Sequence, residues 1–210
     1  MKRILILAPH TDDGEIGCGG SIVKFIEQGK DVFYVAFSTA RSSSAQEGFP
    51  ENILEKEVKA ATKVLGIKQS NLILYDFLVR MFPEYRQDIL EEMIRLKKNI
   101  NPDLIFVPSL NDIHQDHQVI AQEGLRAFKK HTILGYEEPW NNIVFESKSF
   151  ISLEKRHIKK KIEALKCYRS QMHRTYLTED AIWGMAKLRG TQLEGGYAEA
   201  FEVLRWLINI

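Results

Sequence analysis

Two short segments rich in histidine and acid carry most of the side chains that could perform chemistry. Residues 9–15 read PHTDDGE, and residues 111–117 read NDIHQDH. Imidazole and carboxylate ligands together suit zinc, and three protein ligands beside one open position are typical of a catalytic zinc site. If the fold brings the two segments together, they predict a metal-dependent enzyme.

The spacing within each segment supports this interpretation. His114 and His117 are three residues apart, so on one helical turn they share a face and can reach one metal. Asp12 and Asp13 are adjacent and should point in different directions, one toward a metal and the other over the water that the metal activates. Each segment alone has a simpler explanation, either as a solvated helix face or as a turn that caps a helix. The placement of both segments after strands that are expected to be neighbours favours the metal site over these simpler explanations.

The elements between these segments alternate regularly. Short apolar runs predict strands buried on both faces at residues 3–8, 32–37, 72–75, 104–107 and 132–136. Helical periodicity falls between them at residues 16–28, 51–65, 83–100 and 115–130. This alternation predicts an α/β fold of the Rossmann-like, doubly wound type, with a mostly parallel sheet and helices on both faces.

The pattern changes after residue 136. Edge strands are expected at residues 143–145 and 149–151, helices at 154–171 and 179–189, and an apolar segment of uncertain type at 198–208. We expect a single domain over residues 1–210, in which residues 1–136 form the Rossmann-like core and residues 137–210 extend it. The long loop at residues 38–50 is expected to be either a mobile surface loop or a substrate lid.

The predicted fold explains how the two polar segments could meet. They follow the first and fourth strands, which are often neighbours where a doubly wound sheet reverses direction. Ligands bind at that switch point, outside the carboxyl ends of the strands. Neighbouring strands lie about 5 Å apart, so the two segments are expected to be adjacent in space.

Composition excludes several classes of protein. The 210 residues hold 29 basic and 28 acidic side chains, for a net charge of +1, and 44% are hydrophobic. That balance gives no reason to expect nucleic acid as a partner. No apolar run approaches the roughly 20 residues that span a bilayer, and two cysteines cannot build a disulfide scaffold. We therefore expect a cytoplasmic protein without a membrane span, and a homo-oligomeric state stays open.

Residues 10–20, HTDDGEIGCGG, resemble the His-Pro-Asp-Asp-Glu signature of the LmbE-like, or PIG-L, zinc de-N-acetylases. Residues 114–117, HQDH, resemble the second motif of that family, His-Pro-Asp-His. Weaker similarities to the family at residues 57–66, 161–171 and 197–201 extend the resemblance over nearly the whole chain. It implies a zinc-dependent hydrolase that removes an N-acetyl group from an amino sugar or related small glycoside.

The resemblance also implies roles for individual residues. His10, Asp13 and His117 would bind one Zn²⁺ per chain, for which Fe²⁺ or Co²⁺ could substitute. The catalytic residues would be Asp12 as general base, a protonated His114 beside the carbonyl oxygen or the leaving amine, and Asp116, which would orient His114 and raise its pKa. Asp76 falls where the family has a substrate-binding aspartate.

Departures from the family pattern concern the substrate more than the reaction. Gly14 stands where the family usually has a glutamate, whose contact Glu15 could take over. Leu54 stands where the family commonly has a sugar-binding arginine, and Arg41 and Arg80 are candidates to replace it.

Two alternatives stay open at this stage. One is a phosphoester hydrolase with two metals about 3.5–4 Å apart. The other is a non-catalytic module that binds a sugar or nucleotide. The presence of both Asp12 and His114 disfavours the second, because binding alone needs neither a base nor an acid.

Overall fold

The computed structural model describes residues 1–46 and 48–207. The strands are β1 (Arg3–Ala8), β2 (Asp31–Ala36), β3 (Leu72–Leu74), β4 (Leu104–Pro108), β5 (Thr132–Tyr136), β6 (Ser149–Leu153) and β7 (Tyr197–Arg205). The helices are α1 (Asp13–Glu27), α2 (Arg41–Gln46), α3 (Ile53–Leu65), α4 (Arg86–Ile100), α5 (Gln115–Ala127), α6 (Lys155–Leu165) and α7 (Glu179–Gly190).

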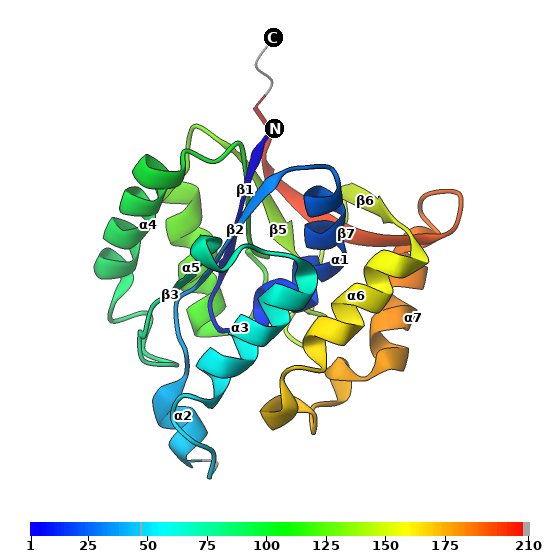
Figure 1. Cartoon of the computed structure of the whole chain (residues 1–210). Helices are drawn as coiled ribbons and strands as arrows, with labels where there is room; N and C mark the ends of the chain where they lie inside the picture. The colour runs from blue at the N-terminus through cyan, green and yellow to red at the C-terminus, as the bar shows by residue number, and fades with distance from the viewer. Residues whose placement is uncertain (47, 208–210) are drawn as a thin grey trace.

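These strands form one sheet in the order β3-β2-β1-β4-β5-β7-β6. The first five strands are parallel, whereas β7 is antiparallel to both β5 and β6. Helices α1, α3, α6 and α7 cover one face of the sheet, and α4 and α5 cover the other (Figure 1). This arrangement confirms the Rossmann-like, doubly wound prediction.

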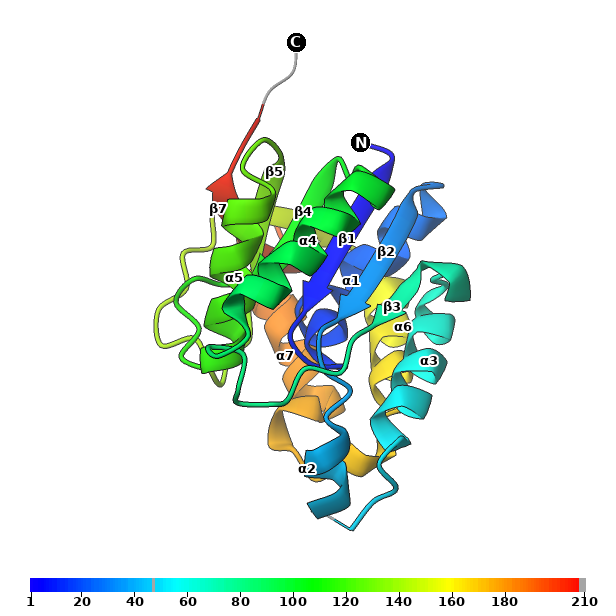
Figure 2. The ribbon, with the colours of Figure 1, turned by 90° about the vertical axis from the view of Figure 1, so that its left-hand side faces the viewer.

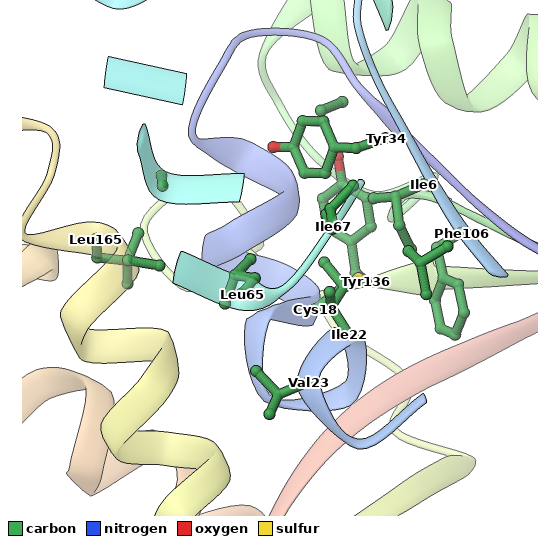
Figure 3. Packing of buried hydrophobic residues seen from close by; sticks show 14 of the residues in the cluster. Ile6, Cys18, Ile22, Val23, Tyr34, Leu65, Ile67, Phe106, Tyr136 and Leu165 are labelled. Atoms are coloured by element: carbon green, nitrogen blue, oxygen red, sulfur yellow. The ribbon is translucent and has the colours of Figure 1, made fainter. Parts of the chain in front are cut away.

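Both faces of the sheet are apolar because alternate side chains of each strand point to opposite sides. On the face toward α1, Ile6 packs with Cys18, Tyr34 and Phe106 (Figure 3). Leu5 and Leu7 belong to the cluster on the opposite face, against α4 and α5. Burial on two faces explains why the strands read as continuous apolar runs in the sequence.

Several element boundaries differ from the prediction. Helix α1 begins at Asp13 instead of residue 16, since acidic side chains in the first turn favour a helix start there. The helix expected over residues 154–171 ends at Leu165 and is followed by a 3₁₀ turn, Arg169–Gln171. The uncertain apolar segment is strand β7 over most of its length, although residue 208 lies outside the described part.

One predicted edge strand is wrong. Residues 143–145 form no strand, and Asn142 instead makes a single β-bridge to Asp112. The side chain of Ile143 is largely exposed there, so its apolar character does not mark a buried strand. The loop at residues 38–50 contains the short helix α2.

Candidate active site

The two polar segments meet where strands β1 and β4 end. These strands are neighbours, with Ile4 opposite Leu104 and Ile6 opposite Phe106. Figure 2 shows their carboxyl ends at one edge of the sheet, from which the chain turns into α1 and α5. The expected adjacency of the first and fourth strands is therefore confirmed.

Three ligand-type atoms converge in this corner. His10 Nδ1 lies 3.2 Å from Asp13 Oδ2, and His117 Nε2 lies 3.4 Å from both of those atoms. Ligands at ordinary zinc distances of about 2.0–2.2 Å in a tetrahedral site are separated by about 3.3–3.6 Å. The three atoms thus have the spacing that a single small cation requires.

Buried carboxylates hold the far side of each imidazole. Asp112 Oδ2 lies 2.8 Å from His117 Nδ1, and Asp116 Oδ2 lies 2.9 Å from His10 Nε2. Histidines that bind a metal almost always donate their other ring N–H to such a group, which fixes the tautomer and the ring orientation. The donor set therefore fits a metal centre and not merely a polar cluster.

Glu138 is a further acid of this corner that sequence reasoning missed. Its side chain is buried, and neither carboxyl oxygen has a hydrogen-bond partner among the described residues. Oε2 lies 3.4 Å from His117 Nδ1. Burial and the neighbouring Asp13 raise its pKa well above the ordinary value. Glu138 lies outside both motifs, two residues beyond β5, and only its position at the same sheet edge could have indicated it.

The adjacent Asp12 and Asp13 have opposite electrostatic surroundings. Burial and the charge of Asp13 raise the pKa of Asp12 to about 6. Burial also acts on Asp13, but the imidazoles of His117 and His10 outweigh it and lower the pKa of that carboxyl. Asp12 is the N-cap residue of α1, yet its side chain makes no capping hydrogen bond. Asp13 is thus suited to bind a cation, and Asp12 to accept a proton near neutral pH.

Asp116 contacts both of the neighbouring histidines, but through different groups. Its carboxylate contacts His10, while its backbone N–H donates to His114 Nδ1 at 3.2 Å, so that His114 caps α5. Burial, together with His117 and His10, lowers the pKa of His114 to about 4. His114 Nδ1 thus accepts a hydrogen bond, and the Asp116 carboxylate lies where it can orient His10.

The expected metal ligands, together with Asp12 and His114, line a cleft of about 360 Å³. The lining residues are His10, Asp12, Asp13, Ser44, Leu54, Val79, Arg80, His114, His117, Trp140, Asn141, Gln171, Arg174 and Tyr176. Among the three candidate substrate contacts, only Arg80 belongs to this set. Arg41 and Asp76 line an adjoining cavity of about 320 Å³, where Arg41 Nε lies 3.5 Å from Asp76 Oδ2.

Three cleft residues come from segments that carry no catalytic motif. The rings of Trp140 and Tyr176 stack with centroids 3.6 Å apart and planes at 10°. Arg174 donates to the Tyr176 hydroxyl at 2.8 Å and to Gln171 Oε1 at 2.6 Å. An aromatic pair and an arginine at the edge of a polar cleft are groups that commonly contact a sugar, but no local spacing in the sequence indicates them.

A buried network fixes the loop that carries Asp12. The hydroxyls of Tyr34 and Tyr168 both contact the Thr11 carbonyl, at 2.8 and 2.6 Å, and both hydrogen-bond Glu15. A side chain at Gly14 would meet the Tyr34 ring, with its Cβ 2.7 Å from the hydroxyl oxygen. Position 14 therefore has no room for a glutamate, and the carboxyl group of Glu15 occupies the network instead.

None of the helices within the described ranges has the length and the apolar character needed to cross a membrane.

Known proteins are similar to this chain over much of its length. The family model described as PIG-L, GlcNAc-PI de-N-acetylase, matches residues 5–128 and so includes both polar segments. The uncharacterized deacetylase YaiS of Escherichia coli (strain K12) is 28% identical over 175 residues, which cover 80% of this chain and 91% of YaiS.

Two further proteins are similar to this chain. Diacetylchitobiose deacetylase of Thermococcus kodakarensis is 25% identical over 134 residues, or 60% of this chain, and the match spans about half (49%) of that enzyme. The crystal structure of the conserved protein TT1542 from Thermus thermophilus superposes with a TM-score of 0.79 at 25% identity, covering 100% of this chain and 98% of that one.

Proposed function

The chain belongs to the PIG-L family of GlcNAc-PI de-N-acetylases, and on this premise we propose that it is a zinc-dependent hydrolase that removes an N-acetyl group from an amino sugar. The observation that carries the proposal is the convergence of His10, Asp13 and His117 within 3.2–3.4 Å of one another. Asp12 and His114 line the same cleft. Together they supply a cation site, a base and a hydrogen-bond donor.

We assign the metal to His10, Asp13 and His117. Zinc, when bound there, would polarise the acetyl carbonyl and activate a water molecule. Two imidazoles and one carboxylate favour zinc, although Fe²⁺ or Co²⁺ fits the same ligands. The carboxylates of Asp112 and Asp116, which lie behind the two imidazoles, supply the negative surroundings that a divalent ion needs.

The side chains beside the metal ligands would transfer the protons and stabilise the charge on the carbonyl oxygen. Asp12, whose pKa is raised to about 6, accepts a proton from the attacking water and can return it to the leaving amine. His114 holds its proton on Nε2 and donates a neutral hydrogen bond to the carbonyl oxygen as negative charge develops there. This division replaces the protonated His114 expected from the sequence.

The proposed substrate class follows from a relative and from the side chains of the cleft. A relative is named for diacetylchitobiose, an N-acetylated sugar. The stacked pair Trp140 and Tyr176 offers an apolar platform for a sugar ring, and Arg80 is the candidate polar contact. Arg80 has a backbone φ of 66° and its N–H donates to Asp116 Oδ2 at 2.7 Å, so its position is tied to the metal site.

The proposal is tested by measuring acetate release from N-acetylated sugars, nucleotide sugars and glycosides, before and after chelation and with zinc restored. We expect release from at least one sugar, loss of that activity with the chelator, and recovery with zinc at one ion per chain. The same preparations are assayed on phosphate esters. Phosphate release with two metals per chain, and no acetate release, would overturn the proposal in favour of a phosphoester hydrolase.

A further inference from the structure

A second cavity, of about 370 Å³, adjoins the catalytic cleft. Trp140 and Tyr176 line both spaces, so the stacked pair forms their shared wall. The cavity lies between the start of α1, helix α7 and strand β7. None of the side chains to which we have assigned a step in amide hydrolysis lines it.

Small and apolar side chains form most of this second cavity. Helix α7 contributes Ile182, Met185 and Ala186, and strand β7 contributes Ala198 and Ala200. A side chain at Gly184 would meet no atom within 4 Å, which shows that the helix stands clear of its surroundings there. Such a lining favours an apolar occupant.

The charged groups at its edge are already paired. Lys161 Nζ lies 2.7 Å from Glu199 Oε1, and Arg189 Nε donates to Glu137 Oε2 at 3.0 Å. These four are the charged residues of the lining, and each has an opposite charge as its neighbour. The cavity therefore offers no unpaired charge to attract an ionic group, and an alkyl chain or aromatic ring can enter without displacing one.

We propose that this cavity is a subsite for an apolar aglycone, an alkyl or aryl group carried by the sugar substrate. The inference rests on the proposed function. The reacting N-acetyl group must face His10 and His117, and the ring would lie against the Trp140–Tyr176 pair. The aglycone leaves the ring at the anomeric carbon, which is bonded to the carbon that carries the acetamido group, and the second cavity begins on the other side of the Trp140–Tyr176 pair.

The first test compares methyl, butyl and hexyl glycosides of N-acetylglucosamine. Each methylene that enters an apolar site is worth about fourfold in binding, so kcat/KM for the hexyl glycoside should exceed that for the methyl glycoside by at least tenfold, mainly through KM. N-butanoyl and N-hexanoyl glucosamines serve as the contrast. A chain-length gain that appears on the acyl group instead of the aglycone would overturn the assignment.

The second test narrows the cavity. Gly184→Leu and Ala186→Leu add bulk to two lining positions, and Lys187→Leu adds the same side chain to helix α7 outside the lining. The readout is the ratio of kcat/KM for the hexyl and methyl glycosides in each protein. That ratio should fall toward one in both lining variants and stay high in the control. An unchanged ratio in a folded lining variant would refute the subsite.

A binding measurement separates this inference from the proposed function. Hexyl glucoside has no acetyl group, so its binding does not depend on hydrolysis. We expect it to bind the native zinc-loaded protein by calorimetry at least tenfold more tightly than methyl glucoside. Absence of acetate release from every glycoside, with this preference intact, would overturn the proposed function alone. Equal binding of both glucosides would overturn the subsite alone.

Discussion

Replacing Asp116 by asparagine should weaken zinc binding, because its carboxylate supports a metal ligand. Oδ2 lies 2.9 Å from His10 Nε2 and accepts the Arg80 N–H at 2.7 Å, while Oδ1 accepts the Phe82 N–H at 3.3 Å. The asparagine carbonyl can keep the first two contacts only by turning its NH₂ toward Phe82 N–H, where two donors would meet.

The size of the effect follows from the charge that is lost. A hydrogen bond to a charged group contributes about 1.5–3 kcal/mol, and each 1.4 kcal/mol is tenfold in affinity. Asp116→Asn should therefore weaken zinc binding by roughly 10- to 100-fold, which is the usual range for groups that support metal ligands. Much of the lost activity should return when zinc is added in excess.

The assay is competition for zinc against a chelator of known affinity, followed by acetate release over a range of free zinc. Asp88→Asn, an exposed acid on helix α4, is the matched control and should behave as the native protein. If Asp116→Asn kept native zinc affinity and its low kcat were not restored by zinc, Asp116 would act through His114, as the family resemblance implied, and our account of its contact with His10 would be refuted.

Three other substitutions test the surroundings of the site. Burial raises the pKa of Glu15 from an ordinary 4.5 to about 8. The protonated Glu15 side chain therefore contributes fully to the free energy of unfolding below pH 4.5, and this contribution is lost as the pH rises through 8, at about 1.4 kcal/mol per pH unit. Glu15→Gln should flatten that pH dependence, which is measured by denaturant unfolding. Gly14→Ala should cost about 1–3 kcal/mol in the same assay, because the new methyl meets the Tyr34 ring, and an unchanged stability would show that Tyr34 can move. Leu54→Arg restores the arginine of the family pattern in the cleft and should raise kcat/KM on N-acetylglucosaminyl-inositol at least fivefold, whereas no change would mean that the position does not contact the sugar.

The sequence predicted the fold well because its signals were local. Strands β1, β4 and β5 of the parallel core are buried on both faces and read as apolar runs, and Gly66 ends α3 with a left-handed φ of 91°. Strands β6 and β7 continue the same sheet, which supports treating residues 137–210 as an extension of one domain. The false strand at residues 143–145 had an apolar composition but no partner to bury it.

The sequence predicted less about the site where a role depends on orientation. His10, Asp13 and His117 meet because β1 and β4 are neighbours, which the order of elements indicated. Whether Asp116 faces His10 or His114 depends on the rotation of the first turn of α5, which no spacing rule fixes. Arg174 and Tyr176 reach the cleft from segments beyond the parallel core, and Glu138 lies beside Asp13 and His117, so only the three-dimensional packing reveals them.

The central claim is that Asp13 binds the metal and Asp12 moves the proton in an amide hydrolysis. It is tested most directly by measuring bound zinc and acetate release in Asp12→Asn and Asp13→Asn, on the sugar that the native protein hydrolyses best. We predict that Asp12→Asn keeps one zinc per chain while kcat falls by roughly 10²–10⁴-fold, and that Asp13→Asn loses zinc and regains part of its activity when zinc is in excess. Loss of zinc from Asp12→Asn, or acetate release unchanged in both variants, would contradict the account.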